Sequence, residues 1–266
     1  MRPVRKAIIA HMNSPITVKP NDVPLAGLDT LYRRIENTGF SFAPATAMAS
    51  WLQALASPGL SDWAQFQASW ENMPPDTYMA DGGRYRRRRH ATLSAGPGNS
   101  PIVLEPHQPH YQSLDYNPLN GGLARYFEPI AQDIVHGPTM QSVLHFCRRV
   151  FGHFMPEAGW HIELHQFRIE AQQGQHGKPT PEGVHRDGVD FVLVMMVRRS
   201  NISSGTTTLH DLHQRPLDSF TLTQPFDSAI VDDARCLHGV TPVEQIDPVL
   251  PAFRDVLVVT FKRKPS

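Results

Sequence analysis

The spacing of hydrophobic residues in the first half of the chain is typical of helices. Apolar side chains recur every three or four positions between residues 25 and 35, and Gly39 follows where such a helix would end. Residues 46–70 repeat the pattern around a Ser-Pro-Gly break, and residues 126–154 repeat it around a Gly-Pro pair. The pattern therefore predicts three helical regions.

The remaining sequence is typical of strands and turns. Residues 74–120 are rich in Pro, Gly and Asn, with short strand-like pieces at 89–93 and 111–116. After about residue 156, short runs of β-branched and aromatic residues alternate with Gly, Pro, Asp and Asn, which predicts a series of strands. These predicted strands are residues 162–169, 184–197, 206–210, 220–223, 229–231, 237–243 and 256–262.

Helices before and strands after favour an α+β fold in which a β-barrel-like core is supported by helices on one side. We treat residues 1–266 as a single domain. Residues 1–155 would give mixed helical support with a few strands, and residues 156–266 would form the core that carries the chemistry. A chain of this length can bury a large core without disulfides, and its two cysteines fit a reducing compartment.

Composition narrows the location and the partners. The 25 basic and 25 acidic residues cancel, which argues against a dedicated nucleic-acid binder. The basic start of the chain has an apolar run of only four residues, too short for a signal peptide, and no run is long enough for a membrane span. We therefore expect a cytoplasmic protein with no membrane or nucleic-acid partner. The sequence does not predict its oligomeric state.

His185 and Asp187 are the best candidates for chemistry. They stand two positions apart, so in an extended segment both point to the same side and offer two adjacent metal ligands. A His-x-Asp pair alone is weak evidence, because a chain with 14 histidines contains such a spacing by chance and a surface turn explains it equally well. His161 and Glu163 have similar spacing and serve as the chance comparison, since they lack the flanking glycines of His185 and Asp187.

His238 and Arg254 complete the candidate site. Two histidines and one carboxylate form the facial triad of non-haem iron oxygenases, which leaves one side of the metal open. Arg254 begins the last predicted strand, and a guanidinium buried in a barrel is costly unless an anion such as a dicarboxylate pairs with it. The alternative is that Arg254 pairs at the surface with Asp255.

These residues lie in segments that resemble a known family. The order His-x-Asp, distal His and then Arg on a final strand resembles the Fe(II)/2-oxoglutarate-dependent dioxygenases. The stretch PEGVHRDGVDFVLVMMVRRSNISSG, with VDDARCLHGVTPV and RDVLVVTFKR, is similar to the bacterial branch of isoleucine dioxygenase-type free amino acid hydroxylases and their biofilm, stress and motility relatives. YMADGGRYRRRRHATL and YQSLDYNPLNGGLARYFEPI in the first half also resemble that branch.

The resemblance implies a double-stranded β-helix, a cupin-like jelly-roll barrel, with flanking helices mainly from the N-terminal half. It also implies Fe(II), 2-oxoglutarate and dioxygen as cofactors, with His185, Asp187 and His238 as metal ligands and Arg254 holding the distal carboxylate of 2-oxoglutarate. One departure concerns Val256, which stands where some relatives have a hydroxyl residue. A second hold on that carboxylate must then come from elsewhere.

The substrate implied is small, most simply a free L-amino acid. Gln166 and Arg168 alternate on one predicted strand and are candidates for binding it, although they equally fit the polar side of an edge strand. The run Arg86 to Arg89 fits an alternating strand with half of its arginines paired better than a phosphate site. Two alternatives stay open: a non-catalytic, cupin-like protein that binds a small ligand or metal, and an oxygenase acting on a macromolecule.

Overall fold

The computed structural model describes residues 27–55 and 59–265. Its helices are α1 (Leu28–Thr38), α2 (Ala45–Leu55), α3 (Trp63–Ala68), α4 (Gln132–Val135) and α5 (Pro138–Phe154). Its strands are β1 (Phe40–Ala43), β2 (Arg86–Ala95), β3 (Ile102–Leu104), β4 (Glu128–Pro129), β5 (Trp160–Ala171), β6 (Phe191–Ser200), β7 (Ile202–Ser204), β8 (Thr206–His210), β9 (Pro216–Thr221), β10 (Ser228–Asp232), β11 (Leu237–Val240), β12 (Val243–Gln245) and β13 (Ala252–Arg263).

All three helical regions are present, but the third begins at Gln132 and not at residue 126, since residues 128 and 129 form β4. α1 ends at Gly39, whose φ of 85° is the left-handed conformation that glycine adopts without strain, and the amide of Gly39 donates to the carbonyl of Ile35. The Gly-Pro pair begins α5, because Pro138 occupies a first-turn position where no amide donor is needed. Leu25, the first residue of the expected pattern, lies outside the described residues.

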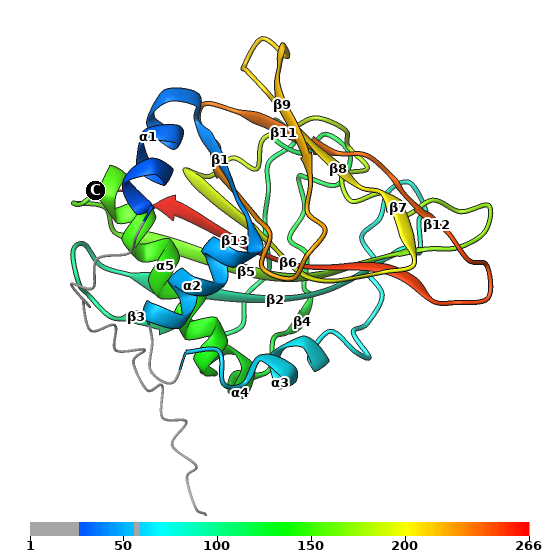
Figure 1. Cartoon of the computed structure of the whole chain (residues 1–266), viewed down its shortest axis with the longest axis horizontal. Helices are drawn as coiled ribbons and strands as arrows, with labels where there is room; N and C mark the ends of the chain where they lie inside the picture. Colours follow the sequence, from blue (N-terminus) through cyan, green and yellow to red (C-terminus); the bar gives the residue numbers. More distant parts are fainter. Residues whose placement is uncertain (1–26, 56–58, 266) are drawn as a thin grey trace, which may run out of the picture.

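The strands form one large sheet and two small ones (Figure 1). The large sheet has the order β1-β10-β6-β13-β5-β2-β3, with β4 paired to β2, and the small sheets have the orders β11-β8-β9 and β12-β7. Over the described residues these ladders remain three separate sheets and do not close into one hydrogen-bonded barrel. The α+β prediction is confirmed at the level of a sheet-rich fold with flanking helices.

Four of the predicted strands are wrong in whole or in part. The strand expected at 237–243 is broken between β11 and β12, and only residues 220 and 221 of the one expected at 220–223 lie in β9. Residues 111–116 form turns, in which the Ser113 carbonyl accepts hydrogen bonds from the amides of Tyr116 and Asn117. The strand expected at 184–197 begins only at Phe191, because Gly188 takes a φ of 78° and turns the chain before it. Residues 184–190 are therefore a loop, and this loop carries the candidate ligands.

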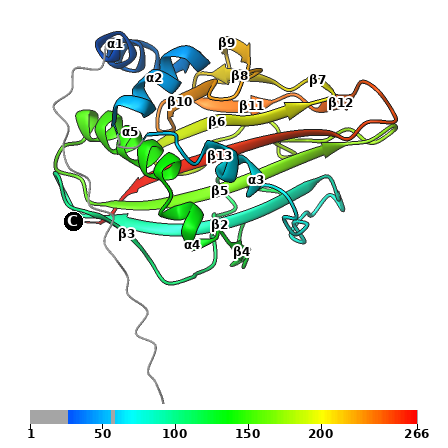
Figure 2. The ribbon, with the colours of Figure 1, turned by 60° about the horizontal axis from the view of Figure 1, so that its bottom comes forward.

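One face of the large sheet packs against the helices and forms the main core. Figure 2 shows α5 lying across the strands of this sheet. Phe151 of α5 stacks on Phe191 of β6 with ring centroids 4.8 Å apart, and both side chains are fully buried. Alternate residues of β5, such as Ile162 and Leu164, point to this same core. The residues between them point to the opposite face, which lines a cavity.

Within the described part of the chain, no helix has both the length and the apolar character needed to cross a membrane.

Candidate metal centre and cavity

Two segments bring the candidate ligands together. The backbones of His185 and His238 form an antiparallel bridge, in which each amide donates to the other carbonyl over 2.9 Å. Asp187 lies between the two imidazoles, with Oδ1 3.5 Å from His185 Nε2 and Oδ2 3.7 Å from His238 Nε2. One ligand atom from each residue lies within 4.8 Å of the others, so a single metal ion can contact all three.

The loop that carries Asp187 is held by Asp233, a buried residue that the sequence reasoning did not single out. The Asp233 carboxylate accepts hydrogen bonds from the amides of Asp187, Gly188 and Val189 at 2.9, 2.8 and 3.2 Å. The amide of Asp233 in turn donates to the Asp190 carbonyl. These bonds fix the direction in which the Asp187 side chain leaves the loop.

The donor chemistry fits a divalent transition metal. His185 Nδ1 lies 3.0 Å from the carbonyl of Gly183, so Nδ1 donates and Nε2 is directed to the metal position, the usual arrangement for a ligating histidine. Two imidazole nitrogens and one carboxylate are the ligand set of non-haem iron sites with open positions. His238 is also buried, and its Nδ1 has no hydrogen-bond partner.

The charges of the three groups depend strongly on one another. Burial lowers the pKa of His185, but the carboxylates of Asp187 and Glu182 outweigh it and raise the value to about 9. Burial and the charge of His185 lower the pKa of His238 to about 4. The Asp187 carboxylate is partly buried, which alone would raise its pKa, but its two histidine neighbours hold the pKa well below the usual range. Without a metal, His185 is therefore protonated and pairs with the Asp187 carboxylate, and a cation that binds to the three side chains takes the place of that proton.

Arg254 lies on β13, on the face of the large sheet that lines the same cavity. It is 2% exposed, and its Nε and Nη2 have no hydrogen-bond partner. Burial and the nearby Arg199 lower its pKa to about 10. The proposed surface pair with Asp255 does not form, because neighbouring residues of a strand point to opposite faces and Asp255 pairs with Arg168 instead. Arg254 thus presents unsatisfied donors to the cavity, as an anion site requires.

Gln166 and Arg168 do not line the cavity, which corrects the prediction that they bind substrate. Both point to the helix side of β5, where Gln166 donates to Ser69 Oγ over 2.7 Å. Arg168 forms ion pairs with Asp255 at 2.7 Å and Glu71 at 3.0 Å. They share one face of the strand as expected, but it is the face that holds α3 and its following turn against the sheet.

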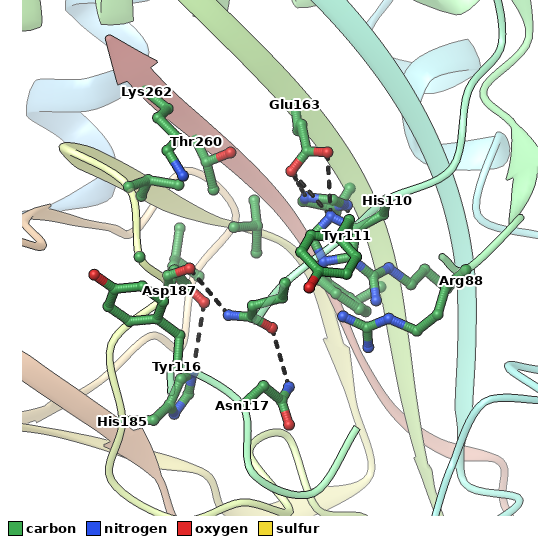
Figure 3. Close-up of a pocket in the computed structure, with 18 of the residues that line it drawn as sticks. Arg88, His110, Tyr111, Tyr116, Asn117, Glu163, His185, Asp187, Thr260 and Lys262 are labelled. Carbon is green, nitrogen blue, oxygen red and sulfur yellow. Dashed lines mark hydrogen bonds and ion pairs between the residues drawn. The ribbon is translucent and has the colours of Figure 1, made fainter. Parts of the chain in front are cut away.

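The opposite face of β5 carries the group that sequence reasoning set aside as a chance pattern. Glu163 lines the cavity together with His110 and His165, and His90 of β2 contacts its carboxylate from beside them. The cavity has a volume of about 640 Å³. Figure 3 shows His185 and Asp187 on one side of it and Glu163, His110 and Arg88 on the other.

The run Arg86 to Arg89 is an alternating strand, as expected, but its buried half was missed. Arg87 and Arg89 pair with Glu170 and Glu128, while Arg86 and Arg88 are buried and line the cavity. The loop between β3 and β4 adds His110, Gln112, Asn117 and Arg125 to the cavity wall. Irregular backbone has no periodicity from which these residues could be predicted. The one signal in the sequence is the resemblance of this segment, YQSLDYNPLNGGLARYFEPI, to the family.

Comparison with known proteins identifies the family of this chain. The family model of the 2OG-Fe dioxygenases matches residues 67–260. The chain is 26% identical over 208 residues to the 3(1)-hydroxy-L-isoleucine 4-dioxygenase of Pantoea ananatis, covering 77% of this chain and 82% of that protein. It is 26% identical over 204 residues to the L-isoleucine-4-hydroxylase of Bacillus thuringiensis, covering 75% and 82%.

Solved structures extend the comparison to the fold. A bsmA homologue from Methylobium petroleophilum PM1 superimposes with a TM-score of 0.80 at 34% identity, covering 91% of this chain and 95% of that one. IDO from Bacillus thuringiensis superimposes with a TM-score of 0.74 over 90% and 100% of the two chains, and its 20% identity supports the fold alone. The chain therefore belongs to the 2OG-Fe dioxygenase family and is an enzyme of that class, which uses iron, 2-oxoglutarate and dioxygen.

Proposed function

We propose that the protein hydroxylates a free L-amino acid in a reaction dependent on Fe(II) and 2-oxoglutarate. The observation that carries this proposal is the meeting of His185, Asp187 and His238 in one cavity with the unpaired guanidinium of Arg254. The relatives named as isoleucine hydroxylases support an amino acid as the substrate. The neutral net charge supports a small-molecule substrate over a nucleic acid. The two cysteines, neither in a CxxC spacing, support a location in the cytoplasm.

We also propose that the three sheets are the two faces of a double-stranded β-helix within a single domain. The large sheet supplies Arg254 and Glu163 to the cavity, and the small sheet of β8, β9 and β11 supplies His238 from across it. A cavity enclosed between two sheets, with ligands from both, supports this description.

The roles of the residues follow from their positions. Metal and co-substrate, when bound, supply the oxidising chemistry that inserts oxygen from dioxygen into an unactivated C–H bond. His185, Asp187 and His238 would bind the iron, and Asp233 would keep Asp187 oriented toward it. Arg254 would pair with the distal carboxylate of 2-oxoglutarate. The cavity walls then exclude water and position the substrate carbon, on which the regiochemistry depends.

The test is an anaerobic titration of the purified protein with Fe(II) and then 2-oxoglutarate, recording the visible charge-transfer band of the complex. We expect the wild type to form the band, His185→Ala to lose it, and Arg254→Met to need far more 2-oxoglutarate to reach it. Arg215→Met, which changes an exposed arginine, is the matched control. Metal binding without any band would reject the assignment and favour a non-catalytic binding protein.

A further inference from the structure

The wall of the cavity opposite the metal ligands carries charged residues that belong neither to the proposed metal site nor to the proposed 2-oxoglutarate site. Arg88 of β2, Arg125 before β4 and Glu163 of β5 all line this wall, and all three are buried. Charged groups are rarely buried without partners, because removal from water costs several kcal/mol per ion. What satisfies these three groups therefore indicates what the cavity binds.

Arg88 and Arg125 lack a carboxylate partner among the described residues. The guanidinium of Arg88 lies between the rings of Phe127 and Phe167, 4.1 and 4.6 Å from their centroids, and its Nε has no hydrogen-bond partner. Arg125 is 1% exposed, and neither its Nε nor its Nη2 has a partner. Together they place two positive charges at the cavity, and neither forms an ion pair with a carboxylate of the described residues.

Arg86, on the same wall, has a carboxylate partner within the chain. Its Nε donates to Asp76 Oδ2 over 2.8 Å, and both residues are buried. The neighbouring arginine two positions along β2 has no such carboxylate. The difference indicates that the anion for Arg88 comes from outside the chain.

Glu163 provides the opposite charge close by. His110 Nδ1 lies 3.0 Å from its Oε2, and His90 Nε2 lies 3.2 Å from its Oε1. These contacts hold the pKa of Glu163 well below its usual range, while burial lowers the pKa values of both histidines. The cluster is thus an ionised carboxylate among neutral imidazoles. His165 and His161 stand farther off, with Nε2 3.6 and 3.7 Å from the carboxylate. Since a carboxylate has about four lone-pair positions, it can accept a donor from the cavity beside its two short hydrogen bonds.

The same hydrogen bonds argue against a second metal ion at this cluster, although His90, His110, Glu163 and His165 lie close enough to ligate one. Arg88 Nη2 lies 3.0 Å from His165 Nδ1. A guanidinium only donates, so Nδ1 is the acceptor and the proton of the neutral ring is on Nε2, the nitrogen that faces Glu163. A ligating histidine needs the reverse, with an acceptor behind it.

We propose that Arg88 and Arg125 bind the α-carboxylate of an amino acid substrate and that Glu163 binds its α-ammonium group. Only the imidazole of His165 separates the Arg88 guanidinium from the Glu163 carboxylate, a spacing that fits two charged groups on one carbon. The zwitterion supplies the missing anion and a cation together, which no simple carboxylate or amine does. This inference rests on the proposed function, which it deepens by assigning the residues that select an amino acid.

The test compares three probes on the anaerobic Fe(II) and 2-oxoglutarate complex, using the shift of its charge-transfer band to measure binding. L-Isoleucine keeps both charged groups, 2-hydroxy-3-methylpentanoate lacks the ammonium group, and 2-methylbutylamine lacks the carboxylate. We expect wild type to bind L-isoleucine at least about tenfold more tightly than either analogue. Equal binding of the hydroxy acid and the amino acid would overturn the role of Glu163, and this comparison needs no variant.

Variants then assign each charge. Arg88→Met and Arg125→Met should each weaken L-isoleucine about tenfold or more and leave 2-methylbutylamine unchanged. Glu163→Gln should abolish the preference for L-isoleucine over the hydroxy acid. Arg87→Met, an outward-facing arginine on the same strand, is the matched control.

Formation of the band at an unchanged 2-oxoglutarate concentration shows that each variant is folded and that its co-substrate site is intact. If the band forms but none of the common L-amino acids shifts it, the inference fails while the metal and 2-oxoglutarate assignments stand. If no band forms in wild type, the proposed function itself fails. Unchanged L-isoleucine affinity in the Arg88→Met/Arg125→Met double variant would also overturn the inference.

Discussion

Buried side chains in this cavity that have no hydrogen-bond partner indicate where a ligand binds. Arg254 is buried with two donor nitrogens unpaired, and its pKa is lowered because burial disfavours the charge. The fold therefore gains nothing from the charge of Arg254 until an anion arrives. Asp255, one residue later, is a buried carboxylate fully engaged with arginines on the other face of the sheet, so it is structural.

This contrast predicts that Arg254→Met separates stability from co-substrate binding. Methionine keeps much of the side-chain volume and removes an uncompensated buried charge, so the free energy of unfolding without ligands should stay equal or rise by about 1 kcal/mol. Affinity for 2-oxoglutarate should fall about a hundredfold. Urea unfolding and 2-oxoglutarate titration measure the two quantities. A loss of several kcal/mol in the variant would instead assign Arg254 a structural role.

His110 predicts how stability depends on pH. Burial, followed by the charge of Arg88, lowers its pKa to about 4 in the folded protein, against about 6.5 when unfolded. The unfolded chain therefore takes up this proton first. Stability is fully present above about pH 6.5 and is lost as the pH falls toward 4, by about 3 kcal/mol from this group. Glu163, with its lowered pKa, acts in the same direction below about pH 4.5.

Urea unfolding between pH 4 and 7.5 checks this expectation. His110→Gln removes the titrating group, so the variant should lose less stability over this interval than wild type, even if it starts lower at neutral pH. His136→Gln, which changes an exposed imidazole on the same protein, is the control. Equal losses in His110→Gln and wild type would show that His110 does not remain neutral in the folded state.

Among the elements, β5 explains both the success and the failure of prediction from sequence. Recurring β-branched and aromatic residues predict residues 162–169 of this 12-residue strand, yet both of its faces are buried and both carry polar groups. Alternation therefore shows that Gln166 and Arg168 share a face, but not which face meets the cavity. A shift of one residue exchanges the two faces, and only the pairing with β2 and β13 decides between them.

The candidate metal ligands were easier to predict from the sequence, because two of the three stand close together. His185 and Asp187 lie on one short loop. His238 lies on a predicted strand that follows them in the sequence. Asp233 was not predictable, because its role comes from accepting three amides some 45 residues earlier in the chain. The loop that carries His110 and Arg125 was equally hidden, since turns fixed by side-chain hydrogen bonds leave no periodic pattern.

The loop after Gly183 gives a prediction for Asp233. Asp233→Ala removes the acceptor of three backbone amides, so the loop should lose its fixed orientation and the affinity for Fe(II) should fall about tenfold or more. Leaving the amides without partners should also cost about 1–3 kcal/mol of stability. Competition with a chelator measures the first effect and urea unfolding the second. Asp218→Ala, at an exposed position on β9, is the control. Wild-type metal affinity in Asp233→Ala would contradict a positioning role.

At the scale of the whole molecule, the two faces of the large sheet differ in what they contribute to stability. The helix face, with Phe151 stacked on Phe191, supplies stability and touches nothing in the cavity. The cavity face carries Arg254 and Arg88, and the loop between β3 and β4 adds Arg125 to the same cavity. All three are buried with donor nitrogens that have no hydrogen-bond partner, so their charges disfavour the folded state. Ligands that bind only the folded state should therefore stabilise this protein, because they supply counter-charges that the chain itself omits.

We expect the melting temperature to rise stepwise when Fe(II) and then 2-oxoglutarate are added under anaerobic conditions. A ligand at about 100 times its dissociation constant contributes about 2.7 kcal/mol, which for a chain of this size corresponds to an increase of roughly 5–10 °C. Arg254→Met should keep the metal step and lose most of the 2-oxoglutarate step at the same concentration. Asp187→Ala should lose both steps, because 2-oxoglutarate then lacks the metal to chelate. A full 2-oxoglutarate step in Asp187→Ala would mean that the co-substrate binds independently of the iron. The expectation that 2-oxoglutarate chelates a metal held by Asp187 would then be wrong.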